Sequence, residues 1–204
     1  MTTGAKSGPA TSRRRFLLAM TVLGVTGLGS VHAQEWTLDM LMSRLASVHS
    51  TRARFVEKRY LAVLKKPIES MGVLIYQAPG HLEKIVHKPK SERVLLEGDQ
   101  ITLEADGGRR RKVVPLSDIP ELAPLVGGLR ATLAGDATAL ARYFTLTLEG
   151  PLEHWRLLLT PLDKKSARLI KFIRIFGTDA DLTSVEVMQA DGDRSLMLMV
   201  KDSE

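Results

Sequence analysis

Two histidines and a glutamate on one predicted strand are the residues of this chain best suited to metal chemistry. His81, Glu83 and His87 occupy odd-numbered positions, so a β-strand would place all three on one face. Imidazole and carboxylate groups are common ligands of divalent transition metals. The same residues also suit a solvated outer strand face, and this interpretation is favoured. We therefore predict no metal site and no cofactor.

The patterns that mark common catalytic sites are missing from the sequence. There is no G-x-S-x-G nucleophile elbow and no glycine-rich phosphate loop. The chain has no cysteine, which excludes a thiol nucleophile, a cysteine metal site and any disulfide. The sequence therefore predicts no catalytic residues and a protein that is not an enzyme.

The densest charge run is RRRK at positions 109–112. Such a run can attract an anionic membrane surface or an acidic partner. It is also typical of an exposed sheet edge, where positive side chains deter pairing with other chains. The edge interpretation is favoured.

The first 33 residues have the pattern of a secretory signal. A basic segment ends at Arg15, an apolar run follows from Phe16 to about Leu28, and a small-x-small cleavage pattern ends at Ala33. The string SRRRFL at 12–17 resembles a twin-arginine signal, and an ordinary signal remains equally open. We expect cleavage after Ala33 and a periplasmic mature chain.

Charge gives no argument for nucleic acid as a partner. The net charge of the whole chain is +6, but four of its positive residues lie in the predicted leader, where there is no acid. Without them, 25 basic residues face 23 acidic ones. Because most of the excess positive charge lies in the predicted leader, no nucleic-acid partner is expected.

Residues 34–204 are predicted to form one domain made mainly of β-strands. An amphipathic helix at 36–49, capped by Thr37, precedes them. Turn residues separate short strands at a spacing typical of consecutive antiparallel pairing in one large sheet. The expected strands are 52–64, 68–77, 81–87, 93–96, 100–104, 109–115, 144–149, 154–160, 169–176, 183–189 and 195–201.

Residues 117–143 interrupt this pattern with a helical insert. Apolar residues recur there at helical spacing, and Asp136 is a candidate cap for a second short helix through Leu140. Pro124 and Gly127-Gly128 are expected to prevent one long straight helix over the insert. The insert either fills a core or covers something, and a lid over an apolar concave sheet is favoured. The apolar stripe consists of Ile119, Leu122, Val126, Leu129 and Leu133.

Several strands are apolar on both faces over part of their length, notably 73–76, 157–159 and 196–200. A sheet with one solvated face alternates more cleanly, so we expect covers on both sides of these strands. The two candidate covers are the first helix and the insert. One interpretation is an ordinary core inside a curled sheet, and the other is a curl that leaves room for an apolar ligand.

The order of these elements resembles the periplasmic lipoprotein-carrier, or LolA-like, family. ARFVE at 53–57 is similar to the family's F-x-Q strand, and SMGVLIYQAP at 70–79 to its glycine-led strand and proline turn. LLEGDQITL at 95–103 matches its Asp-Gly hairpin, and WRLLLTP at 155–161 its L-x-L-x-P strand. The pattern continues at 170–175 and 182–185.

This resemblance implies an unclosed, strongly curved antiparallel β-barrel whose apolar cavity is covered by the N-terminal helix and the insert. It implies a monomer that carries the acyl chains of a lipoprotein or other lipid towards the outer membrane, with transient membrane contact, an inner-membrane releasing complex and an outer-membrane acceptor. A lipid-sensing regulatory module on the same fold is the alternative. The residues expected in the cavity or lid are Phe55, Val73, Ile75, Leu122, Val126, Leu129, Trp155, Leu157, Phe172, Met197 and Met199.

Two positions depart from the family pattern. The family's lid-holding arginine stands immediately before the turn proline, where this chain has Ala78. The aromatic residue usual a few positions later is Lys84 here. The resemblance therefore implies a lid held mainly by the apolar contacts of Leu122, Val126 and Leu129.

Overall fold

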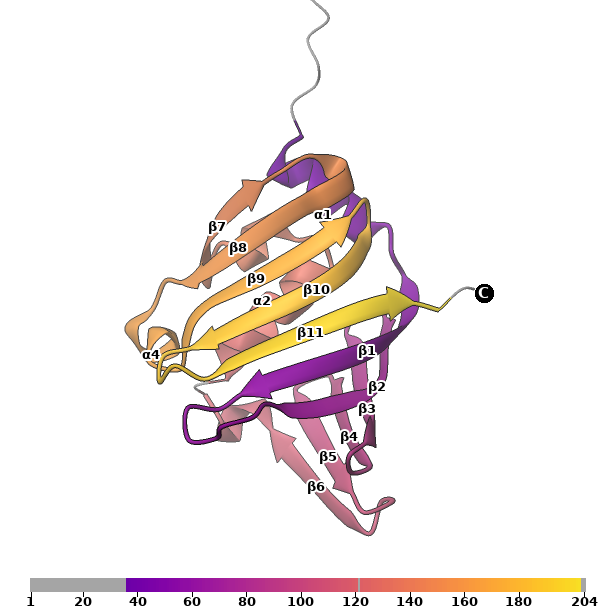
Figure 1. Cartoon of the computed structure of the whole chain (residues 1–204). Helices are drawn as coiled ribbons and strands as arrows, with labels where there is room; N and C mark the ends of the chain where they lie inside the picture. The colour runs from indigo at the N-terminus through magenta and orange to yellow at the C-terminus, as the bar shows by residue number, and fades with distance from the viewer. Residues whose placement is uncertain (1–35, 121, 203–204) are drawn as a thin grey trace, which may run out of the picture. The chain divides into compact units, whose positions relative to one another are not determined.

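The computed structural model describes residues 36–120 and 122–202. The predicted leader, residues 1–33, lies outside the described residues. Within them, the chain forms a single sheet with the strand order β6-β5-β4-β3-β2-β1-β11-β10-β9-β8-β7 (Figure 1). The strands are β1 (Ser50–Tyr60), β2 (Ile68–Gln77), β3 (His81–Lys88), β4 (Glu92–Glu97), β5 (Gln100–Ala105), β6 (Arg110–Pro115), β7 (Phe144–Glu149), β8 (Trp155–Pro161), β9 (Ile170–Thr178), β10 (Asp181–Gln189) and β11 (Arg194–Lys201).

The sheet is built from two meanders that are joined through the first and last strands. Strands β1 to β6 pair consecutively, as do β7 to β11, and every pairing is antiparallel. The ladder between β1 and β11 joins the meanders and places Phe55 opposite Met199. Strands β6 and β7 are the two ends of the sheet, so the barrel is unclosed. This architecture confirms the predicted fold class.

In the described part of the chain, four α-helices accompany the sheet: α1 (Leu38–Ala46), α2 (Ala123–Leu133), α3 (Ala137–Leu140) and α4 (Lys164–Ala167). Single 3-10 turns lie at the start of the insert, at η1 (Leu116–Asp118), and before β8, at η2 (Leu152–His154). The Thr37 hydroxyl accepts from the Met40 amide at 3.3 Å, and Asp136 accepts from the Ala139 amide at 2.8 Å. Both predicted caps are confirmed, because each side chain satisfies an amide that lacks a partner within its helix.

The insert is not one long helix, as predicted, but Gly127 and Gly128 are not where it breaks. Pro124 stands in the first turn of α2, where its missing N–H costs nothing, and both glycines lie inside the helix. A Cβ on Gly128 would come within 2.3 Å of the Phe144 ring, so the glycine lets this aromatic residue pack against the helix backbone. The break comes later, at Gly135, whose φ of +65° suits glycine.

The expectation of covers on both sheet faces was also wrong. Helices α1 and α2 pack on the same side of the sheet, which we call the inner face; it carries Leu157 and Ile175. On the other side, the outer face, Leu198 and Val200 of β11 are 53% and 61% exposed. Strand β11 therefore has apolar side chains on both faces, although only its inner face is covered and its outer face is open to solvent.

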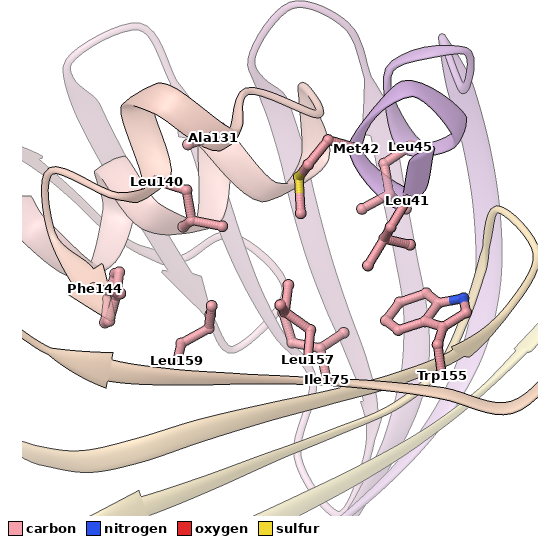
Figure 2. Close-up of a cluster of buried hydrophobic side chains, with 10 residues drawn as sticks. All are labelled: Leu41, Met42, Leu45, Ala131, Leu140, Phe144, Trp155, Leu157, Leu159 and Ile175. Carbon is pink, nitrogen blue, oxygen red and sulfur yellow. The ribbon is translucent and has the colours of Figure 1, made fainter. Parts of the chain in front are cut away.

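The buried core lies where the helices meet β7, β8 and β9. Helix α1 packs onto Trp155 and its neighbours on the strands through Leu41, Met42 and Leu45. Helices α2 and α3 add Ala131 and Leu140 to the same cluster (Figure 2). Gly177 on β9 makes room for Trp155, because a Cβ there would lie 2.1 Å from the indole ring. The Trp155 Nε1 donates to the Asp179 carbonyl at 2.9 Å. This end of the sheet is closed by tight packing.

Candidate functional site

A hollow of about 430 Å³ lies on the inner face, beside the core. Ligand sites typically have volumes of roughly 300–1,000 Å³, so its size suits a small or elongated ligand. Its wall comes from α1, from α2 and from strands of both meanders, and most of its side chains are aliphatic or methionine. They include Leu45, Val48, Leu74, Leu82, Val94, Leu96, Ile101, Val126, Leu129, Leu133, Val185, Val187, Met197 and Met199.

Helix α2 forms one side of the hollow. Val126, Leu129 and Leu133 are spaced three and four residues apart, which puts them on one helix face, and all three line the hollow. Leu122 precedes the helix as its N-cap residue and is not part of the lining. The insert thus contributes wall residues, as a lid would.

Among the residues that the structure describes, two polar contacts connect α2 to the sheet. The Tyr76 hydroxyl donates to the Leu133 carbonyl at 3.3 Å, and burial raises the pKa of this phenol. Arg130 Nη1 lies 3.4 Å from Asp99 Oδ1, whose side chain is 92% exposed. An exposed ion pair contributes about 0–1 kcal/mol, and both contacts are long. Polar attachment of this helix is therefore weak, and apolar contacts hold most of it.

Four of the eleven residues predicted for the cavity or lid line the hollow: Val126, Leu129, Met197 and Met199. Trp155 and Leu157 share the inner face but lie beneath α1 in the packed core, 1% and 0% exposed. Their place in the core follows from the helix above them, which the strand pattern alone does not position.

Val73 and Ile75 point away from the hollow. Successive strand residues alternate between faces, and Leu74 and Tyr76 are the residues of β2 that line the hollow. The sequence 73–76 is apolar at every position, so its pattern could not decide which pair faces inward. The structure places the even-numbered pair there.

Phe172 also lies on the outer face. Its neighbours Ile173 and Ile175 pair with Val187 and Val185, which line the hollow, so Phe172 projects to the opposite side. Its ring packs against the Arg174 guanidinium, 4.3 Å from centroid to Cζ. Such stacking is a common arrangement at partly exposed sheet surfaces.

Phe55 is on the inner face, with its ring 2% exposed. It lies between Ala53 and Glu57, which line the hollow, and the Lys84 ammonium is 5.1 Å from its ring centroid. The ring is therefore buried in the wall beneath a charged side chain. Gly72, opposite Phe55 on β2, lies where the register with β3 shifts, and it allows a close approach of the strands because a Cβ there would lie 1.8 Å from the Ile85 carbonyl oxygen.

A polar cluster in the wall of the hollow was not predicted from the sequence; it consists of Glu57, Ser70, Lys84 and Ser195. Glu57 Oε2 accepts from Lys84 Nζ at 2.6 Å and from the Ser70 hydroxyl at 3.2 Å, and Oε1 accepts from the Ser195 hydroxyl at 2.7 Å. Burial raises the pKa of Glu57, but hydrogen bonds from Lys84 and Ser195 and the charge of Lys84 outweigh it. The pKa of Glu57 is therefore below the ordinary glutamate value.

One signal in the sequence could have indicated part of this cluster. Phe55 and Glu57 are two residues apart on one strand, so a buried Phe55 implies an inward-facing carboxylate. Nothing local indicates that Lys84, 27 positions later, reaches Glu57.

The histidine-containing strand face makes ion pairs. Glu83 Oε1 accepts from Arg93 Nε at 2.5 Å, and His81 Nε2 lies 3.6 Å from Glu83 Oε2. The Arg93 hydrogen bond lowers the pKa of Glu83 against the opposing effect of burial. In the described residues, no three His, Asp or Glu side chains are grouped to hold a metal ion.

The basic run at 109–112 lies on and beside β6, an end strand of the sheet. Arg110 pairs with Asp106 at 2.6 Å and Arg111 with Glu104 at 3.1 Å. This position agrees with the edge interpretation of the run. Among the described helices, none has the length and apolarity needed to cross a membrane.

Comparison with known families decides where this chain belongs. Residues 30–202 match the family model described as "Outer membrane lipoprotein carrier protein LolA-like". The chain belongs to this LolA-like family. The match spans the whole sheet and its helices, and it confirms the resemblance inferred from the strand motifs.

The solved structures that match this LolA-like chain have low sequence identity to it. A LolA superfamily protein from Nitrosomonas europaea is 10% identical, with a TM-score of 0.44, and the match covers 83% of this chain and 95% of that one. An outer membrane lipoprotein-sorting protein domain from Vibrio parahaemolyticus is 9% identical, at 0.43, with 81% and 92% covered. A MucA/MucB complex from Pseudomonas aeruginosa is 13% identical, at 0.45, with 81% and 57% covered.

At these scores, the solved structures carry no argument about function, and the assignment rests on the family match. No curated protein matches the chain.

Proposed function

We propose that this LolA-like protein binds the acyl chains of a lipoprotein or other lipid in the hollow and carries them across the periplasm. The observation that supports this most is an apolar hollow of about 430 Å³ between α2 and the sheet in a chain of this family. Two charged residues of the lining, Asp181 and Lys201, pair with each other at 3.0 Å, and most of the remaining lining is apolar. The signal at residues 1–33 would deliver the chain to the periplasm, with a mature start at Gln34.

The physical basis of such binding is the burial of methylene groups. Each buried CH₂ contributes roughly 0.8 kcal/mol, so a long chain gains several kcal/mol without any polar contact. Met197 and Met199 add unbranched, adaptable lining. Release requires a wall that opens at low cost, and the weak polar attachment of α2 suits that role.

Substitution of one methionine tests the hollow directly. Met197→Asp should weaken binding of the fluorescent fatty acid cis-parinaric acid more than tenfold, because it puts a carboxylate where acyl chains would lie. Leu198→Asp is the matched control, since Leu198 is the next residue of β11 and is exposed on the outer face. Equal affinities for Met197→Asp and the wild type would contradict the proposed site.

Cargo and transport are tested on protein recovered from the periplasm. Native mass spectrometry should find the chain starting at Gln34 with a bound lipid, and the purified protein should move fluorescent lipid between donor and acceptor vesicles. Absence of both bound lipid and fatty-acid uptake would overturn the proposal. Lipid binding without transfer would instead support the lipid-sensing module.

A further inference from the structure

The cluster of Glu57, Ser70, Lys84 and Ser195 is an exception in an otherwise apolar hollow. Glu57 is 7% exposed and lines the hollow, with Met197 of β11 and Ser70 of β2 as its cross-strand neighbours. Burying a charged pair costs several kcal/mol in desolvation, and well-packed apolar residues are often as stable or more stable in its place. Stability alone therefore gives a weak reason for this pair, and ligand recognition gives a stronger one.

The hydrogen-bonding capacity of the cluster points to one kind of ligand group. Both Glu57 oxygens already accept from protein donors, namely Lys84 and Ser70 on Oε2 and Ser195 on Oε1. The Lys84 ammonium has three N–H donors, and its one hydrogen bond among the described residues goes to Glu57. The cluster therefore presents a hydrogen-bond donor, the Lys84 ammonium, to a ligand in the hollow.

The two charged groups differ in their access to the hollow. The Lys84 side chain is 27% exposed, whereas that of Glu57 is 10% exposed. Lys84 also lines the hollow, with its ammonium 5.1 Å from the Phe55 ring centroid. Glu57 and the aromatic face below Lys84 hold the ammonium in place, and its free side is the part that a ligand meets.

From this geometry we propose that Lys84, fixed by Glu57, is a polar subsite that binds the acyl carbonyl group of the carried lipid. The acceptor oxygen belongs either to the carboxylate of a free fatty acid or to an ester of an acylated lipid. The subsite would set how deep the chain enters and would favour acyl lipids over plain hydrocarbons. This inference rests on the proposed function of the hollow.

Three fluorescent polyene probes test the subsite in the full mature chain. They are cis-parinaric acid, its methyl ester and diphenylhexatriene, which has no oxygen. Lys84→Met keeps an unbranched side chain, one atom shorter, and removes its donors, so it should weaken binding of the acid and the ester about tenfold. Diphenylhexatriene affinity should stay within twofold of the wild type. Loss of acid binding alone would support the subsite and assign it to free carboxylates, whereas loss for both probes assigns it to any acyl carbonyl.

Two further variants make the result decisive. Lys88→Met removes the same charge from an exposed position of β3 and should leave all three affinities unchanged. Because Lys84→Met leaves Glu57 buried without its cation, the double variant Glu57→Gln/Lys84→Met restores a neutral wall and should show the same selective loss.

Two outcomes separate the inference from the proposed function. The subsite would be overturned if both Lys84 variants bound all three probes as tightly as the wild type does, or bound all three more weakly by the same factor. In that case, binding of the probes by the wild type would still support the hollow as a lipid site. Failure of the wild type to bind any probe would overturn both.

Discussion

The two ends of the inner face use similar residues for opposite purposes. Along β7, β8 and β9, helices α1, α2 and α3 press onto Trp155, Leu157 and Phe144, which are 0–2% exposed. Along β1, β2, β10 and β11, leucine, valine and methionine face a hollow instead. Apolar composition is therefore shared, and the difference lies in whether a helix fills the space above the strands. The packed end supplies stability, and the open end retains space for a ligand.

The largest expected effect is on stability at the packed end. Trp155→Ala should lower the free energy of unfolding by about 3–5 kcal/mol, because it leaves a cavity and removes the hydrogen bond to Asp179. Met199→Ala, at the hollow, should cost only about 1 kcal/mol, since its side chain is less closely surrounded. Urea denaturation measures both, and equal losses would show that the two ends are packed alike.

An intermediate effect is expected where α2 meets the sheet at the hollow. Tyr76→Phe removes the hydrogen bond to the Leu133 carbonyl and should cost about 1 kcal/mol or less. If α2 moves when ligand leaves, dissociation of cis-parinaric acid should become up to about fivefold faster. Stopped-flow fluorescence gives this rate, and Tyr143→Phe, which packs against Gly127, is the control. An unchanged rate for Tyr76→Phe would argue against movement of this helix.

The smallest expected effect concerns folding stability in acid and involves Glu57 in the wall of the hollow. Glu57 has a pKa below its ordinary value in the folded chain, so the folded state holds fewer protons on this group than the unfolded state does. Its contribution is fully present above the unfolded pKa of about 4.3 and is lost as pH falls through the lower folded pKa. Stability should thus decline below about pH 4.3, and less steeply in Glu57→Gln.

Glu83→Gln is the reference for that measurement, because Glu83 also has a lowered pKa but faces Arg93 on the outer face. Both variants should flatten the acid decline, while only Glu57→Gln should also alter fatty-acid affinity. Identical acid profiles for Glu57→Gln and the wild type would show that the buried pair adds nothing to stability.

Local features of the fold were predictable from the sequence. Each of the eleven expected strands has its counterpart, β2 and β7 with the same bounds, because turn residues and alternation act over a few neighbouring positions. The caps at Thr37 and Asp136 were predictable for the same reason. The apolar stripe of α2 was readable too, since helical spacing fixes one face.

Only the tertiary structure decided what those elements surround. The β1–β11 ladder joins residues more than 130 positions apart, and no local pattern sets such a register. Because α1 packs over Trp155, part of the predicted cavity is core. The register of β2 places Val73 and Ile75 on the outer face. The contact of Lys84 with Glu57 likewise depends on three aligned strands. The sequence by itself determined the elements and the family, whereas long-range pairing and helix docking determined which apolar side chains enclose a core and which line a hollow.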